Sequence, residues 1–176
     1  SLTANEAVSD WDLTATAYND GDCWRGFLLA LSNAVTALEA DNYTPNFKGL
    51  VWWQGESGTS ATDLNNFIAE VRSHLGANYG VGNVSEFPVV ITGTDNRWGT
   101  DLEAGVAAID SYVGYVNAND YGQDYNQDES QFNTHLGSGE RDFSTDIDNN
   151  GSNDMWDIGQ AYADTMAATI SGVGNA

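Results

Sequence analysis

Residues 49–57 read Gly-Leu-Val-Trp-Trp-Gln-Gly-Glu-Ser, and this stretch decides how the rest of the chain is interpreted. A short, wholly apolar run from Leu50 to Trp53 stops at a polar cluster that contains an amide, a glycine and a carboxylate. This pattern is typical of a buried parallel strand whose carboxyl end opens into a binding site. Because ligands bind beyond the carboxyl ends of strands in open α/β sheets, we expect Gln54 and Glu56 at the edge of a crevice.

Helix and strand patterns alternate along the chain on both sides of this stretch. Apolar residues spaced by three and four predict helices over 22–40 and over 64–75, with an end before Gly76, and a further helix is expected over 155–170. Strands are predicted over 48–53, 87–92 and 113–116, and Thr100 with Glu103 forms a capping box for a helix that runs to residue 111. Helices between strands predict an α/β fold with a parallel sheet in a single domain, residues 1–176.

The predicted sheet has an apolar edge. Only three convincing strands can be counted, and residues 12–18 lack the apolar density of a central strand. Without a neighbour, the strand over 48–53 would expose a run of apolar residues at a sheet edge, which promotes aggregation. We therefore expect a partner segment that pairs with this strand.

Composition excludes several classes of partner. The chain has 26 acidic and 5 basic residues, a net charge of −21, which excludes nucleic acid and anionic membranes because both require clusters of Lys and Arg. A hydrophobic fraction of 41% and six Trp argue against disorder. Cys23 is the only cysteine, so no internal disulfide is possible and the redox compartment stays open. The acidity favours a salty or calcium-rich extracellular setting.

Residues 146–157 fit the template of a calcium-binding loop. The sequence Asp-Ile-Asp-Asn-Asn-Gly-Ser-Asn-Asp-Met-Trp-Asp has oxygen ligands at the required positions and a glycine at position 6 for the sharp turn. The predicted ligands are Asp146, Asp148, Asn150, Ser152 through its backbone carbonyl, Asp154 and Asp157. Aspartate at the last position resembles dockerin-type loops more than sensor EF-hands. We expect structural Ca²⁺ that pins the closing helix; the alternative is a solvated turn rich in Asp and Asn.

The chain also resembles a known family. Trp-Trp-Gln-Gly-Glu-Ser at 52–57, preceded by Tyr-Thr-Pro-Asn-Phe-Lys-Gly at 43–49, is similar to the third block of SGNH-type esterases, in the branch of sialate O-acetylesterases and carbohydrate esterase family 6. Residues 67–72, 87–91, 113–120 and 158–166 supply supporting matches. The resemblance implies a three-layer α/β/α, flavodoxin-like sheet of five strands, here lacking its first strands and carrying the calcium loop as an insertion. The family's Gly-Gln-Ser-Asn turn, which carries the nucleophile, does not occur in this sequence.

The same resemblance implies roles for several residues. His135, in Asn-Thr-His-Leu-Gly before the last helix, corresponds to the general base, although Phe132 stands where the family has an orienting Asp. Gln54 corresponds to an oxyanion donor, and Gly55 lets backbone approach the site. Glu56 either orients its neighbours or caps the following helix. His74, on the polar side of a helix, is interpreted as an ordinary surface residue.

Arg97 and Trp98 follow the strand over 87–92 and so belong to the same sheet edge as Gln54. Aromatic faces stack on sugar rings, so the two residues are candidates for lining a carbohydrate cleft; the alternative is a plain loop.

Two functions from different classes follow from these observations. The first is a secreted or periplasmic carbohydrate O-acetylesterase that removes acyl groups from a sugar, with its nucleophilic serine on an N-terminal companion segment. The alternative is a non-catalytic, calcium-stabilised extracellular domain that binds carbohydrate or serves a structural role. The sequence does not specify the acyl group, the sugar, the acid partner of His135 or the oligomeric state.

Overall fold

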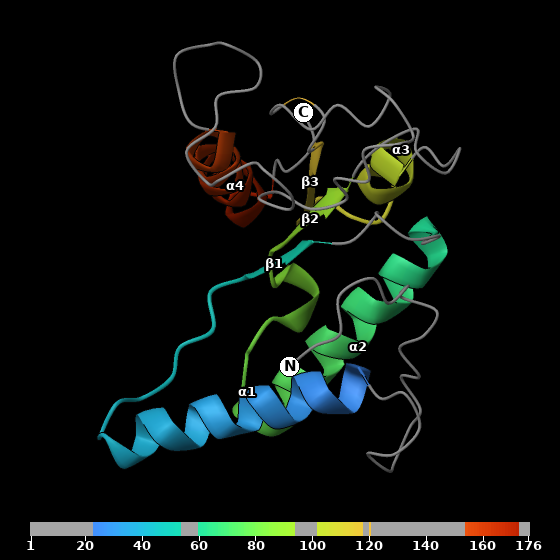
Figure 1. Cartoon of the computed structure of the whole chain (residues 1–176). Helices are drawn as coiled ribbons and strands as arrows, with labels where there is room; N and C mark the ends of the chain where they lie inside the picture. Colours follow the sequence, from blue (N-terminus) through green and yellow to red (C-terminus); the bar gives the residue numbers. More distant parts are fainter. Residues whose placement is uncertain (1–22, 54–59, 94–101, 118–119, 121–153, 173–176) are drawn as a thin grey trace, which may run out of the picture.

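The computed structural model describes residues 23–53, 60–93, 102–117, 120 and 154–172, in which helices and strands alternate (Figure 1). The order is α1 (Cys23–Ala40), β1 (Leu50–Trp53), α2 (Ala61–Tyr79), the short 3-10 helix η2 (Val84–Glu86), β2 (Val89–Gly93), α3 (Leu102–Ala107), β3 (Val113–Asn117) and α4 (Asp154–Ile170). The described strands form one parallel sheet in the order β1-β2-β3. The prediction of an α/β fold with a parallel sheet is confirmed.

Helices cover both faces of this sheet. Side chains alternate between the two faces along a strand, so Val89 and Ile91 pack with α1, α2 and α3, whereas Val90 packs with α4. Figure 1 shows α4 across the sheet from α2 and α3. All five residues of β2 are buried, which explains why the central strand is an almost uninterrupted apolar run.

Helix α2 is longer than its apolar pattern predicts. It begins with a capping box in which Ser60 Oγ accepts from the Asp63 amide at 3.2 Å, and it ends at Gly80, whose φ is +66°. The predicted end before Gly76 is therefore wrong. A Cβ atom at Gly76 would lie 2.7 Å from Val84 Cγ1, so this glycine allows η2 to approach the helix and does not terminate it.

Helix α3 is shorter than predicted and ends at Ala107 instead of residue 111. The chain turns after the helix, with the Ile109 amide donating to the Val106 carbonyl at 3.0 Å. The Asp110 carboxylate then accepts from the Tyr112 amide at 2.8 Å, which directs the chain into β3. Thr100, the predicted cap of this helix, lies outside the described residues.

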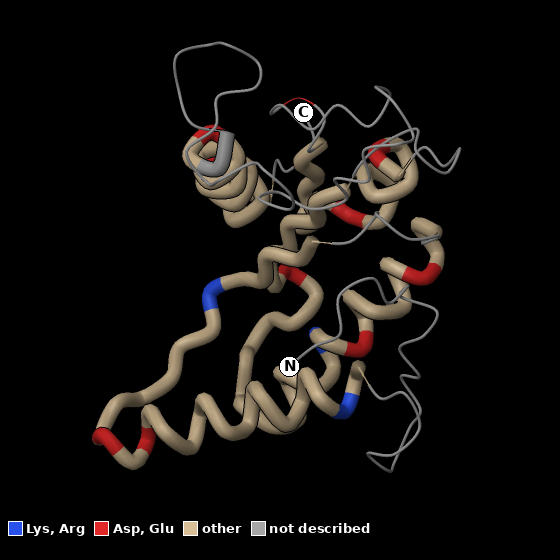
Figure 2. The backbone as a smooth tube through the Cα atoms, in the orientation of Figure 1, with Lys and Arg blue, Asp and Glu red and all other residues tan. Residues whose placement is uncertain are grey.

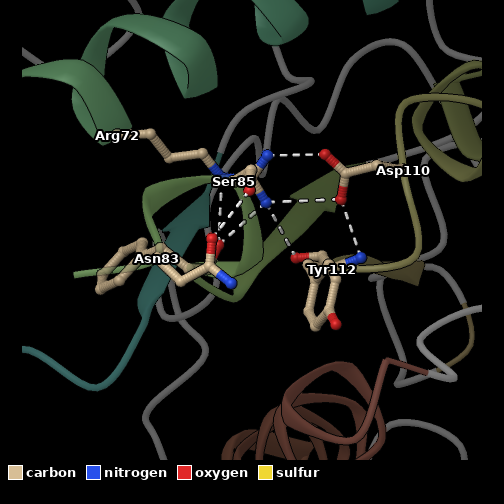
Figure 3. A network of polar contacts seen from close by, with 6 residues as sticks. Arg72, Asn83, Ser85, Asp110 and Tyr112 are labelled. Atoms are coloured by element: carbon tan, nitrogen blue, oxygen red, sulfur yellow. Dashed lines mark hydrogen bonds and ion pairs between the residues drawn. The ribbon is translucent and has the colours of Figure 1, made fainter. Parts of the chain in front are cut away.

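A buried arginine joins α2 to the amino ends of β2 and β3 (Figure 3). Arg72 Nη1 lies 2.6 Å from Asp110 Oδ2, and Arg72 Nε and Nη2 donate to the Phe87 carbonyl at 3.1 and 2.9 Å. Phe87 precedes β2 and Asp110 precedes β3. The guanidinium group therefore holds two consecutive strand entries at a fixed position relative to the helix that packs on them.

Candidate functional site

The carboxyl ends of the three strands lie level with one another at one edge of the sheet. Trp53, the last residue of β1, is in register with Thr92 of β2, and Gly93 at the end of β2 is in register with Asn117 at the end of β3. The loops that follow all three strands therefore leave from the same edge. This arrangement is the one in which open α/β sheets bind ligands.

Two predicted site segments are continuous with this edge. Gln54 follows Trp53 directly, with Gly55 and Glu56 after it, and Arg97 and Trp98 follow Gly93 by four and five residues. These side chains, and that of His135, lie outside the described residues. The structure thus fixes where the first two segments start, and their roles stay predictions.

Two hydroxyl groups lie on the α4 side of the same edge. Thr92 is completely buried, and Tyr162 of α4 is partly buried in the apolar cluster formed by Val90, Val116 and Ile158. Burial raises the pKa of the Tyr162 phenol, and the nearby Thr92 hydroxyl lowers it in part. Within the described residues, however, Thr92 Oγ1 has no partner that meets hydrogen-bond geometry.

The Thr92 hydroxyl thus lies at the carboxyl end of β2, close enough to the Tyr162 phenol to influence its pKa. Sequence reasoning missed both residues. The available signal was that Thr92 is the polar residue that ends the apolar run from Val89 to Ile91.

Helix α4 begins inside the predicted calcium loop. Asp154 is its first residue and Asp157 lies one turn later, whereas Asp146, Asp148, Asn150 and Ser152 lie outside the described residues. Acidic residues at a helix N-terminus also interact favourably with the helix dipole. In the part of the chain that the structure describes, no three His, Cys, Asp or Glu side chains come together as a metal site. The calcium loop stays a prediction.

His74 is less exposed than its interpretation as a surface residue implies. Its ring lies edge-on to Trp24 of α1, with centroids 6.2 Å apart, and 5.7 Å from the ring of Tyr79. Burial lowers the pKa of His74, an effect that Glu70 opposes and Arg25 reinforces. The residue is half-buried and contacts Trp24 of α1 from its position on α2.

No helix within the described ranges is long and apolar enough to cross a membrane. Comparisons of the chain with protein-family models, with curated proteins and with solved structures find no match.

Proposed function

We propose that this chain is part of a serine hydrolase that removes acyl groups, principally acetyl, from carbohydrates, within a flavodoxin-like SGNH fold. One observation carries the proposal: the run Leu50–Trp53 forms a parallel strand, and Gln54-Gly55-Glu56 begins at its carboxyl end, level with the ends of two neighbouring strands. A ligand bound at that edge meets an amide and a carboxylate that start from a rigid element.

The chemistry of ester hydrolysis assigns a role to each predicted residue. A serine from an N-terminal companion segment attacks the acyl carbon, and His135 accepts its proton. As the ester bond to the sugar breaks, His135 gives that proton to the leaving sugar oxygen, which departs as a hydroxyl. The Gln54 amide donates to the oxyanion, and Gly55 lets backbone approach it. Glu56 either orients these groups or caps the following helix. Water then attacks the acyl-enzyme while His135 accepts its proton, and His135 returns the proton to the serine oxygen as the acid, such as acetate, is released.

Carbohydrate is the substrate class that the surrounding residues favour. Trp98 offers a flat apolar face for a sugar ring, and Arg97 offers donors to its hydroxyl groups. Both follow β2, which is the strand next to the one that leads to Gln54. The net charge of −21 and the calcium-type loop at 146–157 fit a secreted or periplasmic protein.

The first test is to label the purified native protein with a fluorophosphonate and to locate the adduct by mass spectrometry. We expect the adduct on a serine of a companion segment, together with release of acetate from an acetylated sugar. Removing an oxyanion donor costs about 10²–10³ in kcat, so Gln54→Ala should lose activity by that factor. His135→Ala should also lose it, and His74→Ala serves as the matched histidine control that retains it.

Other outcomes lead to different conclusions. An adduct on Ser57 would reassign the nucleophile to this chain. The absence of an adduct and of acetate release, in the presence of calcium and of any companion segment, would support the non-catalytic carbohydrate-binding or structural domain.

A further inference from the structure

Helix α4 reaches the β1 side of the sheet through a methionine. The helix packs mainly on β2 and β3, where Met166 lies against the apolar cluster of Val90, Val116 and Ile158. A Cβ atom at Gly49, the residue before β1, would lie 2.8 Å from Met166 Sδ and 2.9 Å from Met166 Cε. The thioether therefore lies directly against the main chain at the start of β1.

The same point is next to the hydrogen bond with which this segment begins to pair with β2. The Cβ atom at Gly49 would lie 3.1 Å from the Pro88 carbonyl oxygen, and that oxygen accepts from the Leu50 amide at 3.0 Å. Pro88 is buried. The sulfur of Met166, a carbonyl and an amide thus meet where the pairing of β1 with β2 starts.

These surroundings suit a thioether better than its oxidised form. Figure 2 shows that β1, β2 and β3 carry no acidic or basic residue. A sulfoxide oxygen is a strong acceptor, as is the Pro88 carbonyl, and the Leu50 amide already donates to that carbonyl. A sulfoxide at Met166 has to compete for this amide or turn away from Gly49 toward water. Both responses weaken the contact between α4 and the start of β1.

Met166 is also within reach of small oxidants, because it is only partly buried and oxidation of methionine follows exposure. We propose that Met166 is a modification site, at which an oxidant of the peroxide class forms methionine sulfoxide and thereby loosens α4 from the start of β1. This inference goes beyond the proposed function and does not depend on it. Strand β1 leads directly to Gln54, so the loosening acts on the strand at which the candidate site starts.

The chemistry needs peroxide alone as co-reactant. A lone pair of the Met166 sulfur attacks one oxygen of hydrogen peroxide, the O–O bond breaks as the S–O bond forms, and the second oxygen leaves as water with both hydrogens. Sulfur is oxidised by two electrons and peroxide is reduced by two. Methionine sulfoxide reductases return the sulfoxide to the thioether, so the change is reversible.

Hydrogen peroxide treatment of the full chain tests the proposal. Peptide mapping by mass spectrometry locates the added oxygen, and NMR measures amide hydrogen exchange at Leu50, whose hydrogen bond lies next to the sulfur. We expect oxidation of Met166 to speed this exchange about tenfold and to lower the urea concentration at the midpoint of unfolding. Treatment with methionine sulfoxide reductases and dithiothreitol should restore both values.

Two variants separate Met166 from the other oxidisable residues. Met166→Leu keeps a similar volume but has no sulfur, so its Leu50 exchange and its urea midpoint should not respond to peroxide. Met155→Leu removes the other of the two methionines in the chain and should respond as the unsubstituted chain does. Both variants keep Cys23, so any effect of thiol oxidation remains in both.

A second pair of variants tests the close approach at Gly49. The Cβ atom added by Gly49→Ala displaces the flexible end of the Met166 side chain, so Met166 should be oxidised faster at the same peroxide concentration. Gly26→Ala, with no atom within 4 Å of the added carbon, should leave the rate unchanged. If Met166→Leu fails to fold, this pair and the unsubstituted chain decide the question.

Three outcomes would overturn the proposal. The first is a Met166 that stays unoxidised while free methionine in the same solution is consumed. The second is complete conversion of Met166 to the sulfoxide with no change in Leu50 exchange or in the urea midpoint. The third is an equal response to peroxide in Met166→Leu, which assigns the effect to another residue. None of these measurements involves catalysis, so the esterase stands or fails separately.

Discussion

Replacing Arg72 with methionine should destabilise the chain more than any other single change to a basic residue in its described part. Methionine is similar in length and fills much of the same volume, but it donates no hydrogen bond. The substitution therefore isolates the polar contribution of the guanidinium group from its packing. Arg72 itself is 8% exposed, so water has little access to the groups left behind.

The loss in free energy of unfolding for Arg72→Met is worked out from the contacts of the guanidinium group. The Phe87 carbonyl, in a residue that is 5% exposed, loses donors at 2.9 and 3.1 Å; an unsatisfied buried acceptor costs about 1–3 kcal/mol. Asp110 loses its ion pair at 2.6 Å, but its side chain is one-third exposed and keeps the Tyr112 amide. Breaking a fully buried pair costs about 3–5 kcal/mol. Since water reaches Asp110, we expect a total loss of about 2–4 kcal/mol.

Urea unfolding, followed by the fluorescence of buried Trp24 and its neighbours, measures this loss. Arg25→Met, at the start of α1, is the matched control and should change the free energy of unfolding by less than about 0.5 kcal/mol. Combining Arg72→Met with Asp110→Asn should cost at least about 1 kcal/mol less than the sum of the single changes. A loss below about 1 kcal/mol for Arg72→Met, or one equal to that of Arg25→Met, would refute the reasoning.

Three other predictions concern different parts of the chain. Gly105→Ala should destabilise by about 1–3 kcal/mol in urea unfolding, because the added Cβ would overlap that of Ala61, whereas Gly26→Ala, with no atom within 4 Å, should be neutral or stabilising. Since burial lowers the pKa of His74 in the folded chain, the unfolded chain binds more protons than the folded chain as pH falls through 6.5, and the free energy of unfolding should decrease there. Urea unfolding at several pH values should show a smaller decrease for His74→Gln than for the unsubstituted chain. Equal decreases in the two would contradict this cause. Calcium should stabilise the folded chain by about 2.7 kcal/mol when free calcium is about a hundred times Kd, and this stabilisation should raise Tm. A chelator or Asp148→Asn should remove the increase in Tm, and a Tm that does not respond to calcium would contradict the loop assignment.

Much of the fold was predictable because elements that are buried on one or both faces carry apolar residues at regular spacings in the sequence. The apolar run at Val89–Ile91 marks a strand that is buried on both faces, whereas the run before Gln54 marks a strand that is only partly buried, with Val51 exposed. The spacing of three and four along α1, α2 and α4 marks the helix faces that pack on the sheet. Helix ends were less predictable. Gly76 resembles a terminator in sequence, but its contact with Val84 comes from a later turn, which no local pattern reveals.

The sheet edge that carries the candidate site was predictable from the sequence, whereas the hydroxyl groups that the structure brings to that edge were not. The change from apolar to polar after Trp53 indicated the carboxyl end of a strand, and the structure places the ends of β2 and β3 level with it. The Thr92 and Tyr162 hydroxyl groups escaped notice, because they approach each other only when α4 packs across β2. Residues that are 70 positions apart in sequence share no local signal.

The sequence by itself determined the class of the fold, since helix and strand patterns that alternate along the chain favour helices packed on a parallel sheet. It also determined the net charge of −21. Only the tertiary structure decided that β2 lies between β1 and β3 among the described strands, and it showed that Arg72 reaches Asp110 across 38 positions. The physical reason is that pairing between strands and the burial of a charged group depend on contacts between distant segments, and these contacts exist only after the chain has folded.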